Sequence, residues 1–381
     1  MNCFEPTDMI YLDNNATTPI ASEVRSEMEP FLGAECGNPS SLHAAGIRAR
    51  AAVEQARSSV AQLIGASSSE IVFTGCGTEG NNLALCGTLA RSPELRLVLS
   101  RVEHPSVLEV GKWWASRGGD VTWIGVDRQG RLNAEALEAA LDGPRALVSL
   151  MWANNETGVL FDIPRIAECV KQHGGIFHTD AVQAAARVAL DVGAVPVDLL
   201  AIAGHKMHAP KGVGALYVRR GVKLDPLFLG GGQEQGLRGG TENVASIVGL
   251  GKAADLIRDD FPETVARISG MRDGFERDLC ERCSRVVING TEAQRLCNTS
   301  HISIADQEAE STMLQLSDMG IAVATGSACA TGSIKTSHVL RAMNMEDRMA
   351  RGSLRVSLGR YTTETELDQT VDALQELVSR S

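Results

Sequence analysis

Lys206 is the residue whose possible chemistry is most specific. It follows the apolar run 199–203, where a chain that leaves a sheet is partly shielded from water. Such shielding lowers the pKa of an amine and lets it form a Schiff base with an aldehyde. The alternative is a solvated loop lysine, the usual environment of this residue type. The segment alone leaves both interpretations open.

An acid and a glycine-rich turn lie in comparable places. Asp180 ends the strand-like run 175–179, where a carboxylate can pair with a protonated pyridine nitrogen or simply cap the next helix. The turn 75–79 lies between strand-like 70–74 and helix-like 81–90. Its glycines and the helix N-terminus suit a phosphate, although such turns are also common without a ligand. The turn matches neither the dinucleotide pattern nor the P-loop pattern.

Cys329 is the third residue of interest. It lies among small residues, between 325–328 and 330–333, which predicts an exposed thiol in a mobile loop. A cysteine is more often a small buried hydrophobic residue, so this position by itself does not establish catalysis.

Alternating strand-like and helix-like segments must position these groups. The strand-like runs are 70–74, 95–100, 121–126, 146–151, 175–179, 199–203 and 214–218. Helix-like stretches at 105–116, 133–141 and 163–173 lie between them, which predicts a mostly parallel sheet covered by helices on both faces. Ligands bind beyond the carboxyl ends of such strands. The polar residues that follow the runs are Thr78, His104, Asn154, Asn155, Asp180, Gln183, His205 and Lys206.

The pattern changes after Gly249. A charged helix-like stretch at 263–283 precedes strand-like 286–289 and 299–304, and 364–379 reads as an amphipathic helix. We therefore expect a large domain over 15–262 and a smaller α+β domain made of 1–14 and 263–381.

Composition limits the class of protein. The chain has 381 residues and a net charge of −11, which argues against direct nucleic-acid binding. We see no signal peptide and no run of about 18 to 20 apolar residues, so we expect a cytoplasmic protein without a membrane span.

The nine cysteines show no framework spacing, which favours a reducing compartment over a disulfide scaffold. Cys280 and Cys283 lie one helical turn apart, and no second pair of matching spacing follows them. His205 and His208 lack the glutamate and third ligand of a zinc peptidase. We therefore expect no metal site.

Taken together, these residues resemble cysteine desulfurases of the NifS and IscS type, within the class-V aminotransferases. The resemblance extends from Tyr11 to the last residues. The segments that carry it are 11–19 (YLDNNATTP), 37–43 (GNPSSLH), 103–104 (EH), 154–158 (NNETG), 180–183 (DAVQ), 204–206 (GHK), 238–243 (RGGTEN), 326–329 (GSAC) and 355–360 (RVSLGR).

The resemblance implies an α/β fold of the pyridoxal phosphate (PLP) transferase fold type I, like aspartate aminotransferase, with a seven-stranded sheet. Lys206 would bind the cofactor aldehyde covalently, Asp180 would keep the pyridine nitrogen protonated, and His104 would stack on the ring. Gln183 would bond the phenolate oxygen. The implied phosphate contacts are Gly77, Thr78, His205 and Thr241 of a partner subunit, because the family works as homodimers.

The implied reaction converts L-cysteine into L-alanine. Arg355 and Asn155 would hold the substrate carboxylate, and Asn155 would also contact the cofactor. The Lys206 amine would move the Cα proton. Cys329, on a mobile loop at about 325–337, would take the sulfur as a persulfide and pass it to an acceptor protein, as in iron–sulfur cluster assembly, tRNA thiolation or DNA phosphorothioation.

Three positions depart from the family pattern. Ala203 replaces a Ser or Thr that contacts the phosphate, which predicts a missing hydroxyl contact. Gly239 replaces a frequent Ser, and Thr336 stands where Pro is frequent. The alternatives are selenocysteine lysis, another PLP-dependent aminotransferase or lyase reaction, and a non-catalytic scaffold. An aminotransferase would not need Cys329, and a scaffold would not need Lys206, Asp180 and His104 together.

Overall fold

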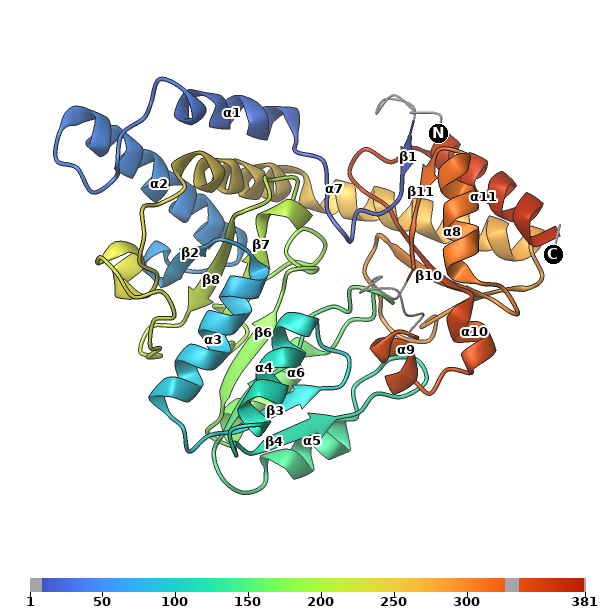
Figure 1. Ribbon diagram of the computed structural model, residues 1–381, viewed down its shortest axis with the longest axis horizontal. Coiled ribbons are helices and arrows are strands. Elements are labelled where there is room, and N and C mark those ends of the chain that lie inside the picture. The colour runs from blue at the N-terminus through green and yellow to red at the C-terminus, as the bar shows by residue number, and fades with distance from the viewer. Residues whose placement is uncertain (1–8, 326–335, 380–381) are drawn as a thin grey trace.

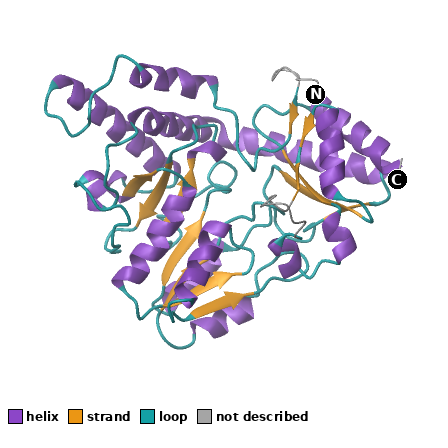
Figure 2. Ribbon diagram, in the orientation of Figure 1, coloured by secondary structure: helices purple, strands orange, loops and turns teal. Residues whose placement is uncertain are grey.

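The computed structural model describes residues 9–325 and 336–379, so the prediction for Cys329 falls outside the described residues. Within them the strands form two groups, each flanked by helices (Figure 2). The larger group lies under α3 and α4 in Figure 1, and the smaller one lies beside α8 and α11.

The larger group is a seven-stranded sheet in the order β2-β8-β7-β6-β5-β3-β4. Its strands are β2 Ile71–Thr74, β3 Arg96–Ser100, β4 Val121–Ile124, β5 Ala146–Ser149, β6 Ile176–Asp180, β7 Leu199–Ala203 and β8 Gly214–Val218. Only β8 runs antiparallel to its neighbours. The predicted fold class, with a mostly parallel seven-stranded sheet, is confirmed.

Period-two alternation along the strands buries both faces of this sheet. Leu97 and Leu99 of β3 pack with α3 and α4, whereas Val98 between them faces the opposite core. The helices that lie against the sheet include α2 Ala44–Leu63, α3 Gly77–Arg91, α4 Pro105–Ala115, α5 Ala134–Leu141 and α6 Ile163–Gln172, whereas α1 Ser22–Leu32 packs on the helix Val244–Arg282. Helices therefore lie on both sides, as the strand–helix alternation predicts.

A single helix, α7 Val244–Arg282, carries the chain out of the first group. Asp260 interrupts its helical geometry with φ −129°, two residues before Pro262, whose ring disfavours a straight helix. The sequence predicts a helix only from 263, because Pro262 obscures the continuity. The proposed division at 262/263 falls near this kink and stays a prediction.

The smaller group surrounds a separate apolar core that includes Leu12, Phe275 and Leu374. Its four-stranded sheet contains β9 Val286–Ile288, β10 Thr299–Ile304, β12 Ala324–Thr325 and β13 Ser353–Ser357. Its helices are α8 Ala309–Asp318, α9 His338–Ala342, α10 Asp347–Arg351 and α11 Glu364–Ser379. In addition β1 Ile10–Tyr11 pairs with β11 Ile321–Ala322, so the N-terminal segment joins this group. None of the helices in the described part of the chain has the length and apolarity needed to traverse a bilayer.

Candidate active site

A cavity of about 390 Å³ lies at the carboxyl ends of the parallel strands, between the two groups. The predicted site residues that line it are Gly77, Thr78, His104, Asn155, Asp180, Gln183, His205, Lys206 and Arg355. All but Arg355 come from the ends of strands or the starts of helices in the large sheet, and Arg355 reaches in from β13. The fold therefore brings widely separated segments to one place.

Lys206 lies in the short 3-10 helix η2 Gly204–Lys206, directly after β7. Its Nζ donates to the carbonyl oxygens of Asn15 and Ala16. Burial, together with the positive charges of Arg355 and Arg187, lowers the pKa of this amine to about 7, although Asp13 and Asp180 oppose the shift. A large fraction of the amine is therefore neutral, and so nucleophilic and basic, at neutral pH.

Asp180 is the last residue of β6, and both of its carboxylate oxygens accept hydrogen bonds. Oδ2 accepts from Asn81 Nδ2 at 2.7 Å, and Oδ1 accepts from the Val182 amide at 3.0 Å. The acid thus caps the following turn and also lines the cavity, so the two interpretations of this position are compatible. Asn81 in addition donates to Ser106 Oγ at 2.9 Å.

Asn81 and Ser106 both line the cavity, and sequence reasoning missed them. A signal for Asn81 was present: it lies three residues after Thr78, on the same face of the first turn of α3. Ser106 gave none, because its hydroxyl meets Asn81 only through the packing of α3 against α4.

Two histidines line the cavity in the neutral form. His104 caps α4, its Nδ1 accepting from the Ser106 amide at 3.1 Å, so the ring proton belongs on Nε2. Burial lowers the pKa of His104. The charge of Lys206 lowers this pKa as well, whereas the Asp180 carboxylate raises it. Burial with the charges of Lys206 and Lys211 lowers the pKa of His205 to about 4. Neither imidazole therefore adds a positive charge at neutral pH.

The start of α3 offers an anion site. Within the part of the chain that the structure describes, the amides of Gly77 and Thr78 have no hydrogen-bond partner. A Cβ at position 77 would come within 2.7 Å of Val182 Cγ2, so glycine is needed there. Ala203 also lines this cavity, with a methyl group, and the expected loss of one hydroxyl contact to a phosphate stays a prediction.

Arg355 is held where a carboxylate could reach it. Its Nη2 donates to Asp13 Oδ1 at 2.6 Å and its Nη1 to the Asn155 carbonyl at 3.0 Å. Its buried Nε has no partner among the described residues. Asn155 thus touches Arg355 through its backbone, and a bound carboxylate would compete with Asp13, a contact that sequence reasoning missed.

Thr241 does not reach this cavity within the chain. It lines a separate cavity of about 140 Å³ together with Gly75, Arg238 and Glu242. The prediction placed it in a partner subunit's site, which a single chain does not test. Gly239 is closely packed, since a Cβ there would lie 3.0 Å from the Gly230 backbone, so a serine would be crowded.

The collected groups fit the cofactor that the resemblance implies. A partly neutral lysine, a buried carboxylate, a neutral histidine and free helix-start amides suit an anionic pyridine aldehyde. The unpartnered Nε of Arg355 suits the carboxylate of an amino acid. No group of three or more His, Cys, Asp or Glu side chains within residues 9–325 and 336–379 could hold a metal ion.

Comparison with known proteins gives a consistent result. Residues 10–370 match the aminotransferase class-V family. A cysteine desulfurase of Trichormus azollae is 48% identical over 373 residues, covering 98% of this chain and 93% of that protein. A solved NifS-like protein superposes with TM-score 0.92 at 35% identity, covering 98% of this chain and 100% of that one. The structure described as SspA in complex with cysteine gives TM-score 0.82 at 34% identity, covering 93% and 100%.

Proposed function

Because the chain belongs to the cysteine desulfurases of the class-V aminotransferase family, we propose that it removes sulfur from L-cysteine and leaves L-alanine. The observation that carries the proposal is the convergence of Lys206, Asp180 and His104 on one cavity that also presents Arg355. The family is PLP-dependent, and when bound this cofactor supplies an aldehyde and an electron-withdrawing pyridine ring.

Each cavity residue then has a defined task. Asp180 would bind the protonated ring nitrogen, and the Asn81 amide holds the carboxylate in place. His104 would cover one ring face, and Gln183 would bond the ring oxygen. Thr78, His205 and the amides at the start of α3 would bind the phosphate.

Lys206 handles the proton of the substrate's α-carbon. With its pKa lowered to about 7, the amine can accept a proton at neutral pH and return it later. Asn15 and Ala16 also line the cavity, and their carbonyl oxygens accept from Nζ and hold the amine in place.

Arg355 would bind the substrate carboxylate through the donors it now gives to Asp13, together with Nε. The thiolate of Cys329 would attack the substrate sulfur. A sulfur–sulfur bond forms, the carbon–sulfur bond breaks, and its electron pair stays on the substrate β-carbon. That carbon takes up a proton, and alanine leaves.

The test is persulfide formation on Cys329. Wild-type protein mixed with L-cysteine should gain 32 Da on the peptide containing Cys329, about the mass of one sulfur atom. Cys329→Ala should lose sulfide release while it keeps cofactor absorbance, and Cys36→Ala, at an exposed cysteine, should behave as wild type. Retained desulfuration by Cys329→Ala would refute the role of this thiol.

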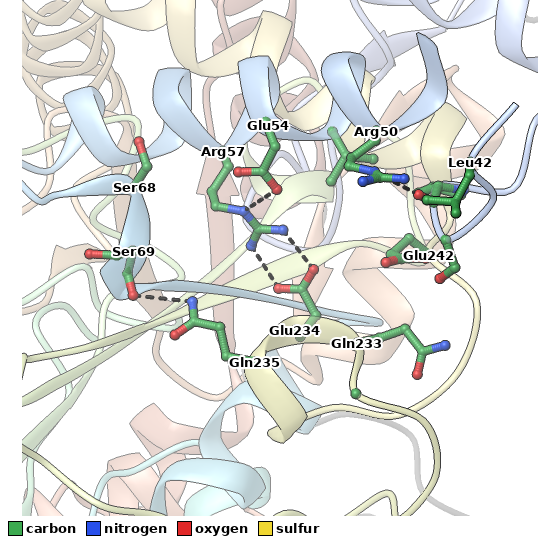
Figure 3. Close-up of a pocket in the computed structure, with 14 residues that line it drawn as sticks. Leu42, Arg50, Glu54, Arg57, Ser68, Ser69, Gln233, Glu234, Gln235 and Glu242 are labelled. Carbon is green, nitrogen blue, oxygen red and sulfur yellow. Dashed lines mark hydrogen bonds and ion pairs between the residues drawn. The ribbon is translucent and has the colours of Figure 1, made fainter. Parts of the chain in front are cut away.

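We propose that the active form is a homodimer in which Thr241 of the partner subunit completes the phosphate site. The surface around Thr241 is unusually apolar: Leu42 and Leu229 are each 85% exposed and Phe228 is 52% exposed. Leu42 lines the open cavity between α2 and the 232–242 segment (Figure 3), and Phe228 and Leu229 precede that segment in the chain. Such residues are normally covered in an assembly.

Light scattering of wild type should therefore report twice the chain mass. Leu229→Asp should yield monomer with weaker cofactor binding, whereas Leu314→Asp, on the exposed side of α8, should not. A wild-type monomer with full activity would contradict the dimer.

An acceptor protein that takes the persulfide sulfur, and a cytoplasmic location, complete the proposal. Transfer of labelled sulfur from Cys329 to a partner in an extract would identify the acceptor. Selenocysteine offered as a competing substrate would measure the preference for sulfur.

A further inference from the structure

Arg187 lies directly behind the cavity and has no task in the reaction so far. Its side chain is buried, and the residue is 9% exposed. Nη1 donates to the Gln183 carbonyl at 3.0 Å and to Gln183 Oε1 at 3.2 Å, and Nη2 donates to the Asn14 carbonyl at 3.5 Å. It shares a small inner cavity with Lys206.

This guanidinium is unusual because no carboxylate pairs with it within residues 9–325 and 336–379. Other buried arginines have such a partner: Arg57 pairs with Glu234, and Arg355 pairs with Asp13. Burial and the charge of Arg355 lower the pKa of Arg187 to about 10, whereas Cys297 opposes this decrease. A buried cation without a counter-charge is costly, so its retention calls for a use.

The contacts with Gln183 fix the direction of that side chain. A guanidinium has donors only, so the carboxamide oxygen must face Arg187. The amide nitrogen must then face the other way, where it donates to the Asn15 carbonyl at 3.0 Å. Its second hydrogen is left for the cavity that Gln183 lines. With the opposite orientation, Gln183 would present an acceptor to an anionic ligand.

The same contacts connect Arg187 to Lys206. The Asn15 carbonyl accepts from both Gln183 Nε2 and Lys206 Nζ. A chain of hydrogen bonds therefore runs from the buried cation through Gln183 and Asn15 to the amine.

We propose that Arg187 is a positioning residue, which holds the Gln183 carboxamide with its amino group toward the cavity and places an unpaired positive charge behind Lys206. This inference rests on the proposed function, because its purpose is to prepare the cavity for PLP. Arg187 itself touches neither cofactor nor substrate.

The charge effect is part of a larger balance around Lys206. The charged and titratable groups that interact with this amine are Asp13, His104, Asp180, Arg187, His205 and Arg355, and His208, Asp260 and Arg360 line the small cavity that Lys206 shares with Arg187. Arg187 and Arg355 lower the pKa of Lys206, whereas Asp13 and Asp180 raise it. The three histidines are neutral at pH 7, since burial lowers the pKa of each. Removal of the charge at 187 should therefore raise the pKa of Lys206.

The test uses the full-length protein and two readouts. The first readout is the pH midpoint for acylation of Lys206 in protein without PLP. Peptide mass spectrometry measures the extent of acylation. The second is the dissociation constant for PLP. For Arg187→Met we expect the pH midpoint to rise by about 0.5 to 1 unit, because a nearby positive charge is lost. We also expect PLP to bind about tenfold more weakly.

Three further variants separate the two effects. Arg187→Lys keeps the charge, so its midpoint should stay at the wild-type value while PLP binds more weakly. Gln183→Leu should weaken PLP binding to a similar extent without moving the midpoint. Arg219→Met, which removes an arginine that likewise donates to backbone carbonyls but far from the cavity, should change neither readout.

An unchanged midpoint in Arg187→Met, or wild-type PLP affinity in Arg187→Lys, would overturn the inference. If Arg187→Met does not fold, Arg187→Lys and Gln183→Leu still decide the orientation role through PLP affinity. Failure of the proposed function would look different, because wild type itself would then bind no PLP, or would bind PLP without releasing sulfur from L-cysteine.

Discussion

Two polar cavities of this protein differ in how their charges are balanced. The larger, about 720 Å³, surrounds Arg57 and Glu234 (Figure 3). There Nη1 and Nη2 of Arg57 donate to the two oxygens of Glu234 at 2.7 and 2.8 Å. Burial would lower the pKa of Arg57, but the Glu234 carboxylate outweighs burial and raises it.

The smaller cavity, about 390 Å³, has the opposite character. Lys206 and Arg187 lie close together, neither is ion-paired with a carboxylate among the described residues, and the pKa of each is lowered. In the same described part of the chain, Arg355 Nε and the amides at the start of α3 have no hydrogen-bond partner. The comparison teaches that unbalanced charge and unpartnered donors, and not volume, distinguish the site that is built for chemistry.

Lys206→Ala should have the largest effect, because it removes the one lysine amine among the described residues that line this cavity. We expect cysteine desulfuration to fall by about 10³-fold or more, in the range seen for loss of a general acid–base or covalent group. Sulfide release and the absorbance of bound cofactor measure the result. Lys211→Ala, at an exposed neighbouring lysine, should retain both. Normal turnover by Lys206→Ala would show that the cavity around Lys206 is not the site of the reaction.

Glu234→Leu should unbalance the larger cavity. It leaves Arg57 with only the exposed Glu54 as an acidic partner among the described residues, and it leaves the Phe73 amide, which donates to Glu234 Oε2, without its acceptor. We expect the free energy of unfolding in urea to fall by about 3 to 5 kcal/mol, and the paired variant Arg57→Met with Glu234→Leu to recover part of it. A loss below about 1 kcal/mol would show that the pair is not what stabilises this region.

Asn81→Ala should have a smaller effect, confined to the active site. Asp180 Oδ2 would lose the donor that holds it, and we expect kcat to fall about tenfold, equivalent to about 1.4 kcal/mol in the barrier. Asn82→Ala provides the control, because the Asn82 amide bonds only to backbone carbonyls. Equal kinetics in the two variants would argue against the role of Asn81.

Glu103→Gln should change how the stability of the protein depends on pH. Burial raises the pKa of Glu103 to about 8, against hydrogen bonds from Ser100 and Met151. The folded state therefore keeps a proton that the unfolded state releases near pH 4.5, so this group's contribution to stability is present at low pH and lost as pH rises toward 8.

Because glutamine does not titrate, the stability of Glu103→Gln relative to wild type should increase from pH 5 to pH 9. Urea unfolding at several pH values measures this difference. A difference that is independent of pH would contradict the buried, protonated state of Glu103.

The sequence by itself determined the sheet and most of the cavity. Apolar runs bounded by short turns predict the seven strands, because a strand that is buried on both faces is apolar along its own length. The rule that ligands bind beyond the carboxyl ends then pointed to His104, Asp180 and Lys206 without any contact being known.

Only the tertiary structure decided which groups balance one another. The Asn81 bond to Asp180, the Asp13 pair with Arg355 and the unpaired state of Arg187 each depend on segments that meet across helices or across the two strand groups. Charge interactions depend on distance and burial in space, which spacing along a chain does not encode. For that reason the sequence indicated where the chemistry lies, and the packing of the chain set the protonation states that make it possible.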